Sequence, residues 1–295
     1  MAGPQHISRG NAVRATILVA AGSIAVQFSA VLAYGLFDTV GPAATGTLRL
    51  LVAAVVLLAV VRPSLRGRTR KEWTAILSYG FSMAAIIICL YLAIARIPLG
   101  IAMTINFLGA CAVALIGARR IRDALLAVIA LLGVALIAGL GGPLDPVGML
   151  FAACSAAGVA VYTLFAARVG QSGSGLAGVT IAITVAAVLT LPISLPGIPL
   201  IQPHQWLPLV LSGLCTPALS FVADTIAGRL TSARVIGVLF AFDPVMGAIF
   251  GALLLGQTLA APSVVGVALI VTAGTGIIWF AGKPQGFELP PLAEG

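Results

Sequence analysis

The sequence predicts an all-α integral membrane protein with ten transmembrane helices, arranged as two inverted five-helix repeats with both termini in the cytoplasm. Composition is the first reason: 60% of the 295 residues are hydrophobic, only 8% are charged, and the mean hydropathy is +1.15. About a quarter of a typical soluble domain is charged. A transmembrane β-barrel is excluded because the apolar runs are continuous instead of alternating with polar residues.

Each predicted helix is an apolar run of roughly 20 residues, the length that crosses a bilayer as a helix. Turn-like segments such as "DTVGP", "GGPLDP" and "RVGQSGSG" separate the runs. The first run is too long for a cleaved signal peptide, so it is retained as a helix. The predicted spans are 15–37, 42–61, 73–95, 98–117, 123–141, 146–169, 176–196, 206–228, 232–255 and 260–281.

The basic residues predict the orientation of these spans. In the predicted topology, 14 of the 16 Lys and Arg residues lie on the same side of the membrane as the N-terminus. Arg96 lies on the opposite side, and Arg49 lies within a span. Cytoplasmic loops carry the excess of positive charge in membrane proteins. We therefore expect both termini to be cytoplasmic, with the basic loops lying at an anionic lipid surface and not on nucleic acid.

Internal similarity predicts the domain organisation. Three stretches recur after an offset of 133 to 135 residues: 131–141 with 264–274, 98–117 with 232–251, and 23–33 with 158–168. Such self-similarity is the signature of duplication. It predicts a first repeat over 1–141, a second over 142–281 and a cytoplasmic tail over 282–295. Because five is odd, the second repeat is inverted, an arrangement typical of secondary transporters with a site near the bilayer midplane.

Polar residues inside the spans are candidate site residues, because polar groups are costly in hydrocarbon. Four of them fall near the middle of their spans: Gln27, Asn106, Tyr162 and Asp243. Asp243 is followed by Pro244, which removes a backbone hydrogen bond and is tolerated where the backbone lines a cavity. Either these residues bind substrate or a coupling ion, or they hydrogen-bond neighbouring helices.

Three further sites are open in the same way. Asp224, near the cytoplasmic end of its span, either pairs with Arg229 or Arg234 or has a gating or proton-carrying role. Arg49 snorkels towards the outer face, pairs with a carboxylate or meets a substrate carboxylate. The third site consists of two aromatic side chains, Tyr79 and Tyr91, which either line the substrate site or serve in packing.

Other function classes lack the residues they need. The sequence contains no HExxH or GxSxG motif and no intramembrane histidine, so we expect no enzyme, no metal and no cofactor. The four cysteines lie inside apolar runs without a CxxC pair, as small core residues do. A channel is disfavoured because no selectivity-filter pattern is present.

Two long stretches, "IPLGIAMTINFLGACAVALIGARR" and "FAFDPVMGAIFGALLLGQTLAAPSVVGVALI", resemble the drug/metabolite transporter superfamily, and most closely its EamA-type amino-acid and metabolite exporters. "GTLRLLVAAVVLL" resembles the second helix of that branch, including Arg49. The resemblance covers roughly 15–281 and rests on the order and spacing of the spans. It implies a ten-helix inverted repeat in a bacterial inner membrane.

The resemblance implies export of neutral or aromatic amino acids and related small metabolites by alternating access; export of other metabolites or amphipathic drugs is the alternative. It places an acidic-Pro pair on Asp243 and Pro244 and an acidic position on Asp224. Related exporters often carry an acidic residue where this chain has Asn106, so proton coupling and ion-independent diffusion both stay open. The expected partners are a small-molecule substrate and the lipid bilayer, with the oligomeric state, monomer or homodimer, undecided.

Overall fold

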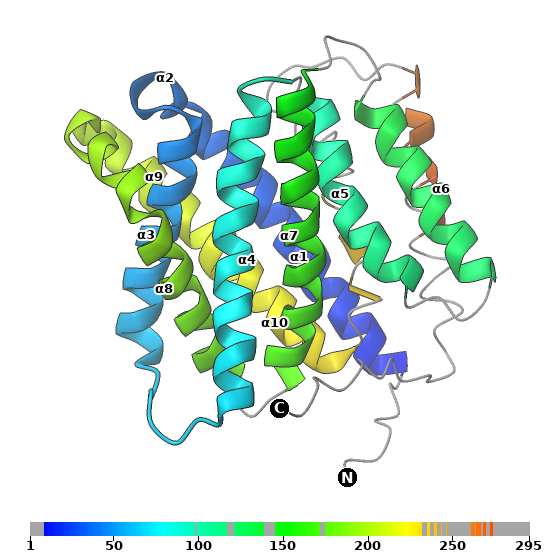
Figure 1. Cartoon of the computed structure of the whole chain (residues 1–295), viewed down its shortest axis with the longest axis horizontal. Helices are drawn as coiled ribbons and strands as arrows, with labels where there is room; N and C mark the ends of the chain where they lie inside the picture. Colours follow the sequence, from blue (N-terminus) through cyan, green and yellow to red (C-terminus); the bar gives the residue numbers. More distant parts are fainter. Residues whose placement is uncertain are drawn as a thin grey trace.

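The chain folds into a bundle of helices, many of them running antiparallel to their neighbours (Figure 1). The structure is a computed structural model. It describes residues 9–97, 99–116, 121–138, 145–171 and 175–231, together with short pieces at 235–236, 239–240, 243, 246, 261–262, 264–266, 268–269 and 272–273. Every regular element within these residues is helical. Most of the ninth and tenth predicted spans, at 232–255 and 260–281, lie outside the described residues.

The described helices agree with the first eight predicted spans to within a few residues at most ends. Their bounds are α1 Arg9–Tyr34, α2 Phe37–Val40, α3 Pro42–Val61, α4 Arg70–Ile94, α5 Leu99–Ile116, α6 Ile121–Ala138, α7 Pro146–Gln171, α8 Gly175–Ser194, α9 Trp206–Gly213 and α10 Phe221–Leu230. Two short 3₁₀ turns, Leu195–Leu200 and Pro203–Gln205, connect α8 to α9.

Six segments are long and apolar enough to cross a membrane: Val13–Ala33, Pro42–Val61, Arg70–Ala93, Pro146–Gln171, Gly175–Leu200 and Pro203–Leu230. Large apolar side chains stay exposed near the middle of these helices, among them Val55, Phe81, Val161, Val188 and Leu219. Exposed apolar surface repeated around a bundle suits contact with lipid tails and not with water. The chain is therefore a multi-pass membrane protein.

Local sequence explains where the helices begin. At α4 the Thr69 hydroxyl accepts from the Glu72 amide at 3.2 Å, and the Glu72 carboxylate accepts from the Thr69 amide at 2.8 Å. This reciprocal capping box satisfies two amides that have no partner inside the helix. At α7 the Asp145 carboxylate accepts from the Gly148 amide at 3.2 Å and pairs with Arg96 at 3.5 Å. Both caps lie at helix ends, where water is available.

Small residues let the helices of the bundle approach closely. Gly109 on α5 faces Ala156 of α7, where an added Cβ would overlap the Ala156 carbonyl. Gly170 on α7 faces α10 in the same way, against the carbonyl of Thr225. Helix association in membranes relies on such close packing, because lipid tails remove the hydrophobic driving force between helices. These contacts hold α7 between α5 and α10.

The predicted single span at 206–228 is interrupted. Between α9 and α10 the backbone adopts a π-helix over Leu214–Ser220, with Pro217 inside it. Proline has no amide hydrogen, and its ring clashes with the preceding turn of an α-helix. A wider π turn accommodates the ring without ending the helix, and such turns are frequent at functional sites.

Candidate functional site

Asp224 on α10 and Tyr162 on α7 meet in the interior of the bundle. The Tyr162 hydroxyl donates a hydrogen bond to the Asp224 carboxyl oxygen Oδ2 at 2.6 Å. Asp224 is only 5% exposed. Arg229, one of the ion-pair partners considered for Asp224, is exposed at the end of α10, and Arg234 lies outside the described residues. Asp224 therefore faces the protein interior and has the Tyr162 hydroxyl as its partner.

Aromatic rings surround this hydrogen bond. The rings of Tyr79 on α4 and Tyr162 lie 5.1 Å apart, and the rings of Phe221 and Phe240 lie 5.4 and 5.9 Å from Tyr162. The Tyr79 hydroxyl is 3.2 Å from the hydroxyl of Thr225, the neighbour of Asp224. Aromatic side chains of this kind exclude water, which strengthens the hydrogen bonds that they enclose.

Asp243 lies beside this group of side chains and is half-buried. Its carboxyl group interacts electrostatically with that of Asp224 and lies close to the hydroxyl of Ser23 on α1. Gln27, one turn along α1, donates from Nε2 to the Asp243 carbonyl at 3.0 Å. We call the set Gln27, Tyr79, Tyr162, Asp224 and Asp243 the carboxylate cluster.

The backbone next to Asp243 bears on the predicted role of proline. Pro244 lies outside the described residues. A proline at this position leaves the carbonyl one turn earlier, that of Phe240, without its helical partner. Here the Phe240 carbonyl accepts a hydrogen bond from the amide of Asp243 at 3.1 Å. The Asp243 carbonyl accepts a hydrogen bond from Nε2 of the Gln27 side chain.

Asn106 on α5 makes a separate contact. Its Oδ1 accepts a hydrogen bond from the Ser155 hydroxyl of α7 at 2.6 Å. Ser155 lies seven residues before Tyr162, a rise of about 10 Å along a helix. The contacts of Asn106 thus lie apart from the carboxylate cluster.

Arg49 on α3 is buried, with 8% of its surface exposed, so its side chain does not snorkel to the outer face. It donates to the hydroxyl of Ser29 on α1, which in turn donates to the Ser212 carbonyl at 2.7 Å. Tyr91 on α4 packs against Gly46, one turn before Arg49, and lies near the guanidinium. Arg49 and Tyr91 therefore lie together, as a second polar group.

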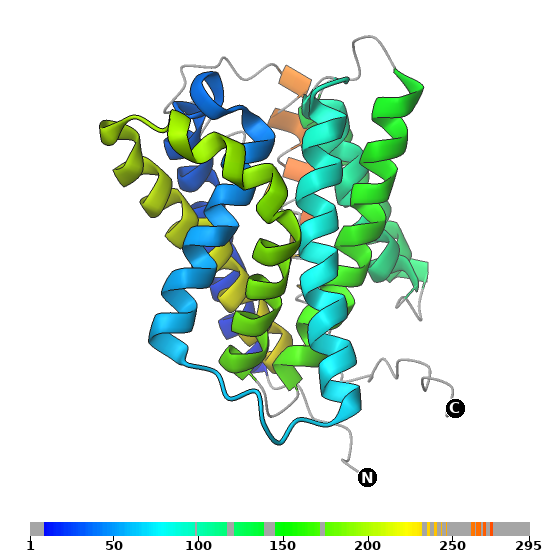
Figure 2. The same cartoon turned by 60° about the vertical axis from the view of Figure 1, so that its left-hand side comes forward.

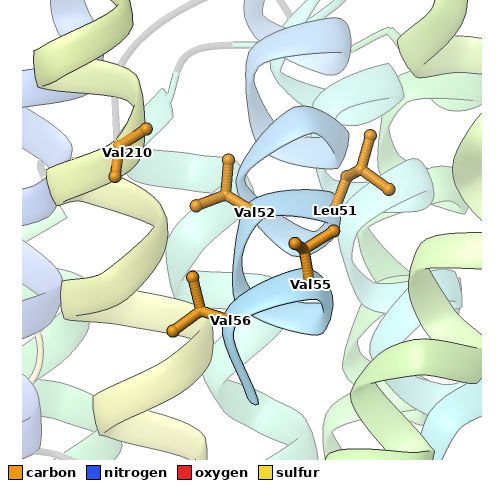
Figure 3. A pocket seen from close by; sticks show the side chains of 5 residues that line it. All are labelled: Leu51, Val52, Val55, Val56 and Val210. Atoms are coloured by element: carbon orange, nitrogen blue, oxygen red, sulfur yellow. The ribbon is translucent and has the colours of Figure 1, made fainter. Parts of the chain in front are cut away.

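An open hollow of about 280 Å³ lies between α3 and α9 (Figure 3). Its lining consists of hydrocarbon side chains, those of Leu51, Val52, Val55, Val56 and Val210. Such a lining offers no hydrogen bond or charge to an amino acid or other polar cargo. Among the residues that the structure describes, no group of His, Cys, Asp and Glu is placed to hold a metal ion.

Sequence reasoning missed the hydroxyl residues of the site. Ser29, Ser155 and Thr225 each contact a predicted site residue. Serine and threonine are nevertheless frequent in membrane helices and bond their own backbone there. Thr225 does so, donating to the Phe221 carbonyl at 2.8 Å. For Thr225 the sequence did offer a signal, its position next to Asp224, since a second polar residue beside a buried carboxylate is unusual in an apolar helix.

Comparisons with known proteins bear on the family and the fold of this chain. Residues 146–279 match the model of the EamA-like transporter family. The threonine/homoserine exporters RhtA of Salmonella typhimurium and of Escherichia coli K12 are each 32% identical to this chain, over 88% of it and 89% of their own length. A solved structure described as "Crystal structure of protein" matches with a TM-score of 0.72 at 18% identity, over 90% of this chain and 96% of that one. The likeness to the solved structure concerns the fold alone. The similarity to the exporters is a similarity of sequence, and it extends over 88% of this chain. The chain belongs to the EamA-like transporter family.

Proposed function

We propose that this protein exports amino acids of the threonine and homoserine class across a bacterial inner membrane, as a secondary transporter. The relationship to threonine/homoserine exporters over 88% of the chain supports this cargo. The multi-pass helical bundle supports the location, because transporters of this kind span the membrane many times.

The carboxylate cluster is the observation that carries the proposal. Two carboxyl groups in a membrane-spanning bundle are costly, and such residues mark substrate or ion pathways. Asp224 is buried and bonded to Tyr162, whereas Asp243 is half-buried and next to Asp224. Asp243 is the more accessible of the two, so we assign to it the contact with the ammonium group of the amino acid or with a coupling proton.

Five segments supply the cluster: α1, α4, α7, α10 and the segment that carries Asp243. In Figure 1 α1 and α10 run obliquely behind the more upright α4 and α7, and the yellow α10 is oblique to them in Figure 2 as well. We propose alternating access, in which rocking of the first five-helix repeat, 1–141, against the inverted second repeat, 142–281, opens the cluster to each side in turn. The family match at 146–279 falls within the second of these units.

The distribution of charge supports cytoplasmic termini. The start of α1, the connection 62–69 and the ends of α7 and α10 lie together at the lower edge of Figure 1, opposite α2. The described basic residues of these segments and of the start of α4 are Arg14, Arg62, Arg66, Arg68, Arg70, Lys71, Arg168 and Arg229. The opposite edge carries Asp38, Asp145 and Arg96. A membrane protein places its basic edge in the cytoplasm.

Uptake of labelled threonine, homoserine and tryptophan into proteoliposomes tests the proposal. We expect saturable uptake of threonine and homoserine. Accumulation above equilibrium only under an imposed pH gradient would identify a proton as the coupling ion, and equilibration that ignores the gradient would identify a facilitator. Uptake of tryptophan would extend the cargo to aromatic amino acids. No uptake of any of the three by folded protein would refute the proposal and favour other metabolites or amphipathic drugs.

A further inference from the structure

Arg49 is a cation in the interior of a membrane-spanning helix. It lies in the span Pro42–Val61 and is 8% exposed. Burying a guanidinium is costly unless it is paired, and intramembrane cations mark substrate pathways. In the carboxylate cluster, hydrogen-bond donors surround the acidic groups. Arg49 is a buried positive charge and needs the opposite, an acceptor that neutralises it.

The contacts of Arg49 are neutral. The Ser29 hydroxyl accepts a hydrogen bond from its Nη2, and the uncharged side chains of Tyr91 and Cys215 lie nearby. The described ion pair between Arg96 and Asp145 lies at the ends of the helices, away from Arg49. No described carboxylate therefore balances the Arg49 charge.

Asp243 also lies away from Arg49 in this state. Gln27, which contacts Asp243, and Ser29, which contacts Arg49, are two residues apart on α1. Two residues of an α-helix are about 200° apart around its axis but only about 3 Å apart along it. The guanidinium and the carboxylate cluster thus lie at similar depth on different sides of α1. One amino acid, whose ammonium and carboxylate groups share a carbon atom, does not reach both, so with the carboxylate on Arg49 the role of Asp243 is to bind the coupling proton.

Two buried hydrogen-bond donors in this part of the bundle have no described partner. One is the Arg49 Nε–H itself, and the other is the hydroxyl of Thr216. Thr216 follows Cys215 in the π-helix, which packs against both α1 and α3. Buried polar groups are nearly always hydrogen-bonded, so the unpaired Nε–H of an unneutralised cation indicates a missing acceptor with negative charge.

We propose that the Arg49 guanidinium binds the carboxylate of the transported amino acid, in a subsite formed by Arg49, Ser29, Tyr91 and the π-helix. This inference rests on the proposed amino-acid cargo. A guanidinium presents donors in a planar fork that matches the two oxygens of a carboxylate. The subsite makes the carboxylate a requirement, so it admits amino acids and rejects their amides and the corresponding amines.

Competition in proteoliposomes tests this subsite. Uptake of labelled threonine is measured against unlabelled threonine and against threoninamide, which keeps the ammonium and hydroxyl groups but lacks the carboxylate. In the wild type, threonine should compete at least about tenfold better than threoninamide, since a hydrogen bond to a charged group corresponds to roughly ten- to 100-fold in affinity. Equal competition by the two compounds would overturn the inference.

The variant R49Q separates binding from a structural role. We expect its half-saturation constant for threonine to rise about tenfold or more, while the inhibition constant of threoninamide stays within about twofold. The exposed Arg66 provides the matched control, since R66Q should leave both constants unchanged. A structural Arg49 would instead alter both constants equally or lower only the amount of active protein, and either result would overturn the inference.

A second variant covers the case in which R49Q does not fold. R49K keeps the charge but loses the planar fork, so the constant for threonine should rise about threefold or more with that for threoninamide unchanged. Equal changes in the two constants would overturn the inference. Absence of threonine and homoserine uptake by the wild type would instead remove the proposed function, and the inference with it.

Discussion

Removing one oxygen atom, by Tyr162→Phe, tests whether the hydrogen bond to Asp224 holds α7 against α10. The substitution keeps the ring and its contacts with Tyr79 and Phe221, 5.1 and 5.4 Å away. It deletes a 2.6 Å hydrogen bond to a carboxyl that is 5% exposed, which leaves a buried acceptor unsatisfied. Such a loss costs about 1–3 kcal/mol, so we expect the free energy of unfolding to fall by about 2 kcal/mol.

The assay is unfolding of the purified protein in mixed micelles, with Tyr79→Phe as the matched control. Tyr79 loses a longer contact, 3.2 Å to a neutral hydroxyl, so its variant should lose about 1 kcal/mol at most. A double-mutant cycle with Asp224→Asn should give a coupling energy of at least about 1 kcal/mol. Additive effects of Tyr162→Phe and Asp224→Asn, or equal losses for the two tyrosine variants, would refute the reasoning.

Three other changes probe the cluster and the packing around it. Asp243→Asn should abolish transport while leaving folded protein, because the amide can neither carry a proton nor pair with an ammonium group; normal flux in the variant would remove Asp243 from the mechanism. Gln27→Ala removes the 3.0 Å contact to the Asp243 carbonyl and should weaken threonine binding by about fivefold, read from saturation curves; an unchanged constant would leave Gln27 a purely structural role. Gly170→Val places a side chain against the Thr225 carbonyl and should cost about 2 kcal/mol or more of stability, whereas Gly35→Ala, with open space around it, should cost under about 0.5 kcal/mol; similar thermal midpoints for the two would contradict the packing.

The positions of the helices were predictable because hydrophobicity and length decide them in a bilayer. The second and sixth predicted spans, 42–61 and 146–169, correspond closely to α3 and α7. The eighth, 206–228, was predicted as one helix, yet it contains the π-helix around Pro217. Apolarity alone does not reveal such a local widening, and the proline was its sequence signal.

The partners of the site residues were less predictable than their positions. Sequence offered Arg229 or Arg234 as the partner of Asp224, since opposite charges near one helix end attract each other. The structure gives Asp224 the hydroxyl of Tyr162, 62 positions away in the chain. Only packing of α7 against α10 produces that contact, and a single sequence does not specify which faces of two apolar helices meet.

The inverted repeat stays a prediction, together with the cytoplasmic termini and the alternating-access mechanism. The ninth and tenth predicted spans carry much of the second repeat and lie largely outside the described residues. Within the ninth span, the structure does describe Asp243. Its carbonyl accepts a hydrogen bond from Gln27, and its carboxyl group interacts electrostatically with that of Asp224. Those contacts tie the second half of the chain to α1 in the first half.

Counterflow of threonine is the measurement that tests the central claim most directly. Proteoliposomes are loaded with unlabelled threonine and diluted into a trace of labelled threonine, so that exchange alone drives labelled cargo inwards. The proposed function predicts transient accumulation of label in wild-type vesicles. A wild-type trace equal to that of protein-free vesicles, from protein shown to be folded, would contradict the assignment of this chain as a threonine exporter.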